Sequence, residues 1–174
     1  MNVSFDEIVN NIKHLKGARG RMEQVPSERG SFIVDYAHTP DALTQVLTSL
    51  KAHCTGKLIA IFGCGGDRDK GKRPLMAQAG LALADRVILT ADNPRSENPN
   101  AILSDMQVGM TCDDHYRTVI EPDRKRAIEL AIKEAGEQDI VVIAGKGHET
   151  YQEIQGVRYD FDDVAVVREL LNKK

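Results

Sequence analysis

The segment LIAIFGCGGDRDKGKRP, residues 58–74, decides the fold class, because an uninterrupted apolar run passes directly into a glycine-rich polar loop. Three further apolar runs occur at residues 32–34, 87–89 and 140–144. All of them are continuous rather than alternating in polarity, which is typical of strands covered on both faces of a sheet. The sequence therefore predicts buried strands of one sheet.

Amphipathic helical patterns separate these runs. They begin at Pro40, at Asn98-Pro99 and at Pro122, which would place proline at the first position of each helix, where its missing N–H costs nothing. Strands that alternate with helices of this length predict βαβ units, an α/β fold and a mostly parallel sheet with helices on both faces. Residues 151–160 predict a hairpin and one antiparallel edge strand, and a last helix follows with Asp160 as its N-cap.

The beginning of the chain has a different character. Residues 1–17 predict a helix in which Ser4 and Glu7 have the spacing of a capping box. The segment GARGRMEQVPSERGS, residues 17–31, has no periodicity and the composition of a linker. We expect residues 1–19 to be a tail helix and linker of a preceding domain, and residues 20–174 to form the domain itself.

Composition excludes several classes of protein. The 174 residues suffice for about one domain, and the net charge of −3 argues against a nucleic-acid or membrane-surface protein. No apolar run approaches the roughly 20 residues that span a bilayer. The acidic N-terminus does not resemble a secretion signal, so we expect a cytoplasmic location. Three widely spaced cysteines are expected to be reduced thiols.

Polar or glycine-rich segments follow four of the predicted strands. They comprise residues 35–40, 63–74, 92–97 and 145–149. Ligands of open α/β sheets bind at the carboxyl ends of the strands, so these segments predict a binding site. The alternative interpretation is that loops are polar anyway, which is weaker for four loops at one sheet edge than for any one of them.

Three familiar motifs do not match. A dinucleotide fingerprint fails because Arg68 stands where the third glycine is needed. A P-loop fails because Ile140 stands at its first glycine, and a zinc-protease helix fails because Gln152 replaces the second histidine. We therefore predict no metal site in this chain.

The charges near the strand ends predict a zwitterionic ligand. Arg68 and Arg95 can bind a carboxylate, and Asp92 and Glu149 can hold an ammonium group. Lys70, Lys72 and Arg73 are interpreted instead as a solvated loop ahead of a helix at Pro74. A pocket with both signs of charge suits a free amino acid.

These motifs together resemble the Mur ligases. The segments are DYAHTPDAL at 35–43, GCGGDRDKGKRP at 63–74, DNPR at 92–95 and AGKGHE at 144–149. The resemblance covers the chain from Gly20 onward. Within the family, the motifs most resemble the members that add the third residue of the peptidoglycan stem peptide.

The resemblance implies a Rossmann-like C-terminal domain of a ligase that forms an amide through an acyl phosphate. ATP and Mg²⁺ would be bound mainly by a central domain that this chain lacks, so the chain alone is expected to be inactive and no catalytic residue is assigned. The implied partners are the amino acid and UDP-MurNAc-L-Ala-D-Glu, and we expect a monomer.

The resemblance also implies residue roles. The implied amino-acid-binding residues are Arg68, Asp92, Asn93, Pro94, Arg95, Gly145 and Glu149. Arg68 and Arg95 would grip a carboxylate, and the others would hold the amino group and backbone. The implied nucleotide contacts are Arg21, Asp35, Tyr36 and His38.

Arg95 bears on which amino acid is added. The DNPR segment resembles the members that add meso-diaminopimelate, whose distal carboxylate would attract the guanidinium, whereas the ammonium of lysine would be repelled. Two alternatives stay open: a lysine-adding ligase and a free-standing module that binds an amino acid or a nucleotide. A Rossmann dehydrogenase is disfavoured by Arg68 in the fingerprint.

Overall fold

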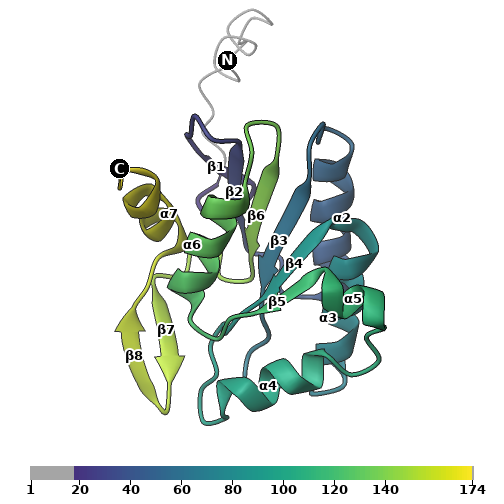
Figure 1. The fold of residues 1–174 in the computed structure, drawn as a ribbon. Helices are drawn as coiled ribbons and strands as arrows, with labels where there is room; N and C mark the ends of the chain where they lie inside the picture. The colour runs from purple at the N-terminus through teal and green to yellow at the C-terminus, as the bar shows by residue number, and fades with distance from the viewer. Residues whose placement is uncertain (1–17, 174) are drawn as a thin grey trace, which may run out of the picture.

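A six-stranded sheet forms the centre of the molecule (Figure 1). The computed structural model describes residues 18–173. The strands are β1 (Glu23–Val25), β2 (Ser31–Asp35), β3 (Leu58–Phe62), β4 (Arg86–Leu89), β5 (Thr118–Ile120) and β6 (Ile140–Ala144). Their order is β1-β2-β6-β3-β4-β5, and only β1 is antiparallel to its neighbour. The predicted α/β class and mostly parallel sheet are confirmed.

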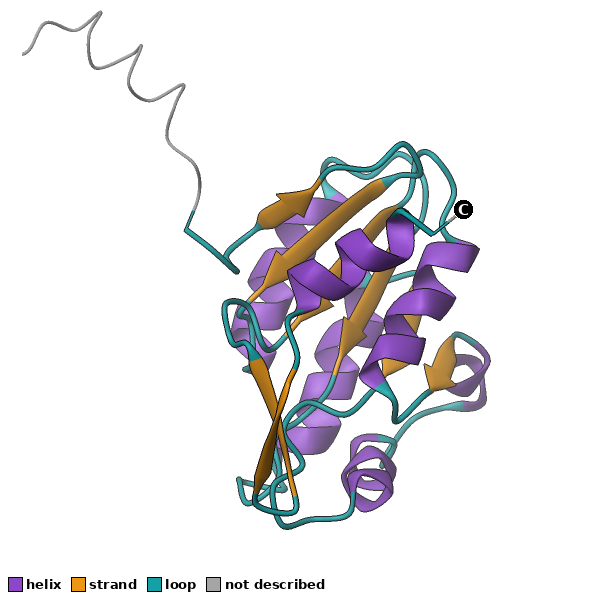
Figure 2. Cartoon of the chain, turned by 90° about the vertical axis from the view of Figure 1, so that its left-hand side faces the viewer, coloured by secondary structure: helices purple, strands orange, loops and turns teal. Residues whose placement is uncertain are grey.

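Helices cover both faces of the sheet (Figure 2). On one face, α2 (Pro40–Lys51) and α3 (Lys72–Leu83) pack on the strands, and α4 (Pro99–Met106) packs against α3. On the other face lie α6 (Arg124–Glu134) and α7 (Asp163–Leu171). The short α5 (Cys112–Tyr116) precedes β5.

Two apolar clusters, one on each face, explain why the strands read as continuous apolar runs. In β3, Ala60 and Phe62 point to the α2–α3 side, while Ile59 and Ile61 point to the α6–α7 side.

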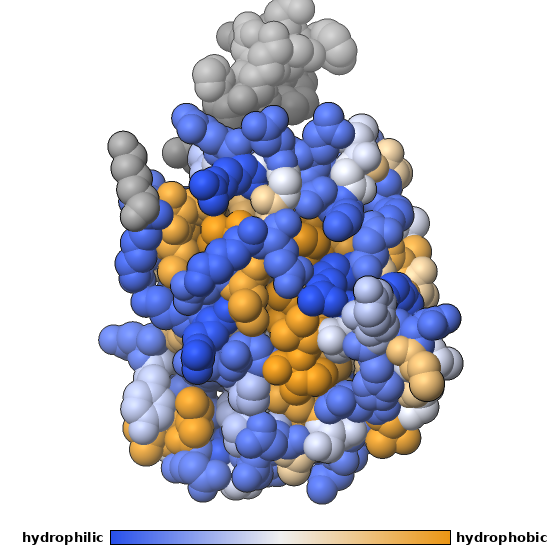
Figure 3. Space-filling view, viewed as in Figure 1, coloured by the Kyte–Doolittle hydropathy of each residue, from blue (hydrophilic) through white to orange (hydrophobic). Residues whose placement is uncertain are grey.

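Figure 3 shows a strip of hydrophobic surface between α6 and α5, with hydrophilic side chains on either side of it. None of the helices between residues 18 and 173 is long and apolar enough to span a membrane.

The prediction of the antiparallel edge strand was wrong about its position. Residues 151–160 do form a hairpin, of β7 (Tyr151–Ile154) and β8 (Val157–Asp160), but it is a separate two-stranded sheet. The antiparallel edge strand of the main sheet is β1, which lies in the segment interpreted as a linker. Three residues are too few for a periodic pattern, so pairing with β2 rather than local sequence defines this strand. The tail helix predicted over residues 1–17 lies outside the described residues.

Three helix starts also differ from the prediction. The helix expected at Pro74 is α3, which begins two residues earlier, at Lys72. Asp123, not Pro122, precedes α6, and its side chain accepts the Arg126 N–H as an N-cap. Asp162 rather than Asp160 caps α7, accepting from the N–H groups of Val164 and Ala165. An aspartate is among the best N-caps, and a nearby competing residue obscured each position in the sequence. The predicted starts at Pro40 and Pro99 are confirmed.

Candidate functional site

The carboxyl ends of β2, β6, β3 and β4 surround a cavity of about 560 Å³. This is the lower side of the sheet in Figure 1, where the hairpin lies. The cavity is lined by Tyr36, His38, Thr39, Gly63, Cys64, Gly65, Arg68, Asp69, Lys72, Met76, Asp92, Asn93, Arg95, Gly145, Glu149 and Tyr151. Loops from four strands and the first residue of the hairpin therefore build one pocket.

The loops after β3 and β4 are bonded directly to each other. Gly66 N–H donates to the Asn93 carbonyl at 2.9 Å, and Arg95 Nη1 donates to the Gly66 carbonyl at 2.8 Å. A Cβ on Gly66 would lie 1.9 Å from the Pro94 oxygen, so only glycine permits this approach. The contact brings Arg68 and Arg95 to the same wall.

Charged side chains strengthen this junction. The Asp67 carboxylate accepts hydrogen bonds from the Ser96 hydroxyl at 2.6 Å and from the Ser96 N–H at 3.2 Å. These two bonds lower the pKa of Asp67. Glu97 accepts the Asp67 N–H and forms a two-pronged ion pair with Arg73. The ion pair with Arg73 is the main reason that the pKa of Glu97 falls to about 2.

Arg73 corrects the interpretation of this loop as wholly solvated. Its side chain is 1% exposed and bridges Glu97 and Asp105, both at 2.7 Å. Lys70 is 70% exposed, as predicted, whereas Lys72 lines the cavity. The arginine therefore fixes the loops in place and is not free to bind a ligand.

Arg95 has an unusual backbone that the hairpin stabilises. Its φ of 51° lies in the left-handed region, which a bulky residue seldom occupies. The Arg95 N–H donates to the Glu153 carbonyl, and its carbonyl accepts the Gln155 N–H. Gln152 Nε2 donates to the Asp92 carbonyl at 2.8 Å. The hairpin thus holds residues 92–96 in the conformation that places Arg95 in the cavity wall.

An acidic wall of Asp92 and Glu149 lines the same cavity as these arginines. Asn93 Nδ2 donates to Glu149 Oε2 at 3.0 Å, which ties the loop after β4 to the loop after β6. Lys146, fully buried, lies within 3.6 Å of Asp92 Oδ1 and 3.5 Å of Glu149 Oε2. Two carboxylates and two arginines therefore line different parts of one pocket, which suits a ligand with both an ammonium and a carboxylate.

The predicted nucleotide contacts lie partly outside this cavity. Tyr36 and His38 line it, with their rings 4.6 Å apart, and the Arg21 guanidinium lies 5.8 Å from the Tyr36 ring. The carboxylate of Asp35 is buried and accepts the N–H groups of Met22 and Ala37. A nucleotide contact by these residues stays a prediction.

Most of the predicted amino-acid-binding residues converge. The cavity is lined by Arg68, Asp92, Asn93, Arg95, Gly145 and Glu149. Pro94 is buried against Gly66 and does not line the cavity. Lys146 had no predicted role beyond the failed P-loop motif, and Cys64 had none at all. Burial raises the pKa of the Cys64 thiol to about 12, so the thiol stays protonated.

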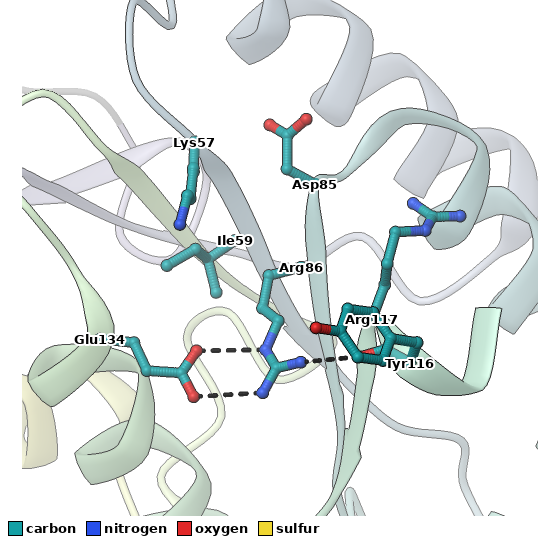
Figure 4. Close-up of a pocket in the computed structure, with 7 residues that line it drawn as sticks. All are labelled: Lys57, Ile59, Asp85, Arg86, Tyr116, Arg117 and Glu134. Carbon is teal, nitrogen blue, oxygen red and sulfur yellow. Dashed lines mark hydrogen bonds and ion pairs between the residues drawn. The ribbon is translucent and has the colours of Figure 1, made fainter. Parts of the chain in front are cut away.

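A second hollow, of about 390 Å³, lies at the opposite end of the sheet. Figure 4 shows that Arg86 in this hollow is already paired, with two bonds to Glu134 and one to the Tyr116 carbonyl. These bonds join β4 to α6 and to the segment before β5. We assign this hollow to the support of the fold, because the polar loops of the strand ends lie elsewhere.

The fold and the site together define an α/β domain with a cavity lined by charged side chains at the carboxyl ends of its strands. Comparison with known proteins gives the family: residues 20–147 match the one described as "Mur ligase, glutamate ligase domain". The chain belongs to this family.

Several relatives are similar over nearly the whole chain. Two proteins named UDP-N-acetylmuramoyl-L-alanyl-D-glutamate--2,6-diaminopimelate ligase, from Pseudomonas putida and Bacillus licheniformis, are 47% and 50% identical over 98% and 96% of the chain. A solved structure with the same name superposes with a TM-score of 0.86 at 52% identity, covering 98% of the chain. The chain spans about a third of these relatives: 34% of each of the first two and 35% of the solved one.

More distant structures share the fold alone. Folylpolyglutamate synthase from Thermotoga maritima superposes with a TM-score of 0.63 at 21% identity, over 99% of this chain and 35% of that one.

Proposed function

We propose that this chain is the amino-acid-binding domain of an ATP-dependent ligase that joins meso-diaminopimelate to UDP-N-acetylmuramoyl-L-alanyl-D-glutamate in peptidoglycan synthesis. The observation that carries the proposal is the pocket itself, which is lined by Arg68 and Arg95 and also by Asp92 and Glu149. The names of relatives that are 47% to 50% identical support the same substrates.

The chemistry of the pocket favours a ligand that carries an extra carboxylate. A guanidinium pairs with a carboxylate through two parallel hydrogen bonds and repels an ammonium group. Arg95 would therefore bind the distal carboxylate of diaminopimelate and disfavour lysine, which has an ammonium without a carboxylate at that end. The carboxylates of Asp92 and Glu149 would hold an ammonium group.

The ligase reaction needs groups beyond this domain. The family's chemistry forms an acyl phosphate on the acceptor substrate, which the amine of the incoming amino acid attacks, and phosphate then leaves. The part of the chain that the structure describes has no cluster of three His, Cys, Asp or Glu side chains suited to a metal ion. We propose that ATP and Mg²⁺ are held mainly by another domain, with Arg21, Tyr36 and His38 facing the nucleotide. Holding the amine in place against the acyl phosphate would be this domain's share of the rate.

Substitution of Arg95 tests the proposal. In a ligase polypeptide that contains this chain, Arg95→Gln should raise the KM for meso-diaminopimelate about tenfold to a hundredfold, because a charged hydrogen-bond pair is worth roughly 1.5–3 kcal/mol. The KM for ATP should stay within about twofold of its wild-type value, because substitutions at well-separated sites have nearly independent effects. The exposed Arg29, substituted by Gln, is the matched control. An unchanged KM for diaminopimelate in Arg95→Gln would contradict the proposal.

A further inference from the structure

Lys146 is a buried ammonium directly behind the wall of the cavity. It follows Gly145 at the end of β6, its side chain is 0% exposed, and it does not itself line the cavity. An ammonium buried away from water is costly unless it is paired and hydrogen-bonded. The identity of its partners therefore decides what Lys146 does.

All three partners of Lys146 are cavity-lining side chains. Its Nζ lies 3.1 Å from Asn93 Oδ1, 3.5 Å from Glu149 Oε2 and 3.6 Å from Asp92 Oδ1. The first two contacts are hydrogen bonds, whereas the contact with Asp92 Oδ1 is an ion pair without a hydrogen bond. Lys146 therefore contacts the acidic wall of the pocket from the side away from the cavity.

These contacts fix the orientation of the Asn93 amide. Its oxygen accepts from Lys146 Nζ and from the Glu153 N–H at 3.0 Å, which occupies both of its lone pairs. Its nitrogen must then point the other way, where it donates one hydrogen to Glu149 Oε2. The second Nδ2 hydrogen and the Glu149 Oε1 atom have no hydrogen-bond partner among residues 18–173. One donor and one acceptor thus remain for a ligand.

The charges in this wall do not balance. Asp92 and Glu149 carry two negative charges against the single positive charge of Lys146. The nearby Arg124 is already neutralised by Asp163 at 2.8 Å. Asp92 Oδ1 is buried and accepts no hydrogen bond within the described part of the chain. The wall therefore lacks one cation, which a ligand ammonium would supply.

We propose that Lys146 is a positioning residue of the amino-acid site. It holds the Asn93 amide and one oxygen of Glu149 from behind, so that Asn93 Nδ2 and Glu149 Oε1 are set in advance to receive a carboxylate or hydroxyl and an ammonium. The inference rests on the proposed function in that its ligand is an ammonium-bearing amino acid. Preorganisation of this kind strengthens binding because the side chains lose little freedom when the ligand enters.

Kinetics of the ligase polypeptide that contains this chain give the first test. Lys146→Met keeps the length of the side chain and removes its charge, and we expect it to raise the KM for meso-diaminopimelate by about tenfold or more, the scale of one lost charged hydrogen bond. The KM for ATP should change less than about twofold. Lys57→Met, in the hollow of Figure 4, is the matched control.

A double-mutant cycle separates positioning from a general structural role. Because Lys146 acts in part through Asn93, the double variant Lys146→Met/Asn93→Ala should bind diaminopimelate less weakly than the product of the two single effects, since contacting residues are not additive. Independent effects that multiply, or a KM in Lys146→Met equal to that of Lys57→Met, would overturn the proposal.

NMR of the 174-residue chain needs no ligand and decides the case in which Lys146→Met does not fold. In the wild-type chain the Lys146 Nζ protons should exchange slowly with water and show through-space contacts to the Asn93 side chain. Fast exchange without those contacts would refute the positioning role. A wild-type ligase that does not use diaminopimelate would contradict the proposed function instead, and the NMR result would still decide the role of Lys146.

Discussion

Arg73 and Arg124 are buried and stabilise the fold, although nothing in the sequence distinguishes them from the other lysines and arginines near the strand ends. Arg73 holds Glu97 and Asp105 at the junction of two loops. Arg124 forms a two-pronged pair with Asp163, both 0% exposed, and also donates to the Ala144 carbonyl at the end of β6. Burial lowers the pKa of Arg124, but the charge and hydrogen bonds of Asp163 outweigh it and the pKa is raised. Both arginines therefore stay charged and hold the loops around the cavity.

Glu97 gives the pH dependence of the loop junction. Its pKa falls from 4.5 to about 2, mainly through its bonds to Arg73, so the folded state favours its ionised form. The stabilisation is complete above pH 4.5, where an unfolded glutamate is also ionised, and is lost as the pH falls toward 2. We expect Glu97→Gln to lose less stability than the wild type between these two pH values, as measured by urea denaturation.

The control for this prediction is Glu137→Gln, an exposed glutamate on the loop before β6. Its acid-induced loss of stability should equal that of the wild type. A Glu97→Gln profile parallel to the wild-type profile would show that Glu97 contributes nothing through ionisation.

Loss of Arg124 should be strongly destabilising. Arg124→Met leaves the Asp163 carboxylate buried without its partner, which costs about 3–5 kcal/mol of unfolding free energy. The double variant Arg124→Met/Asp163→Leu removes both charges and should recover most of that loss. Chemical denaturation checks both values; a single variant within about 1 kcal/mol of the wild type, the typical effect of an ordinary substitution, would be inconsistent with an unpaired buried charge.

At the scale of elements, the hairpin β7–β8 is the least expected feature. It packs not into the main sheet but along residues 92–96, with the bridge between Arg95 and Ile154 as its pairing contact. Gln152, 8% exposed, donates to the carbonyls of Ala91 and Asp92. The hairpin therefore supports the loop that carries Arg95.

Gln152→Ala should loosen this support without unfolding the domain. It leaves two buried carbonyls without a donor, at a cost of about 1–3 kcal/mol. In hydrogen exchange we expect faster exchange of the Arg95 and Gln155 amides, which join the loop to the hairpin, with unchanged protection in β3 and β6. Val157→Ala, at an exposed apolar side chain of β8, is the control and should have a smaller effect. Unchanged exchange at Arg95 would show that the hairpin does not depend on Gln152.

The sequence predicted elements where local signals were strong and missed those defined by distant contacts. Leu58–Phe62 and Ile140–Ala144 were recognisable because strands covered on both faces are apolar throughout. The three-residue β1 has no such pattern and exists through its pairing with β2. The strand-end rule located Arg95 and Glu149, whereas Lys146 was missed because its three acceptors come from two separate loops.

At the scale of the whole molecule, the doubly covered sheet has different features at its two ends. The carboxyl ends of four parallel strands meet at the cavity of about 560 Å³, whereas Arg86 and Glu134 are paired across the opposite hollow. The chain spans about a third of its relatives, and we propose that it supplies the amino-acid site while other parts of a ligase supply the rest of the reaction. The central claim is that Arg95 chooses between amino acids by the charge at their far end.

A comparison of meso-diaminopimelate and lysine as substrates tests this role of Arg95 most directly. The measurement is phosphate release by a ligase polypeptide that contains this chain, with UDP-MurNAc-L-Ala-D-Glu, ATP and either amino acid. We predict turnover with meso-diaminopimelate and a kcat/KM for lysine lower by about a hundredfold or more, since a repelled charge adds to a lost ion pair. Equal kcat/KM values for lysine and diaminopimelate would contradict the account.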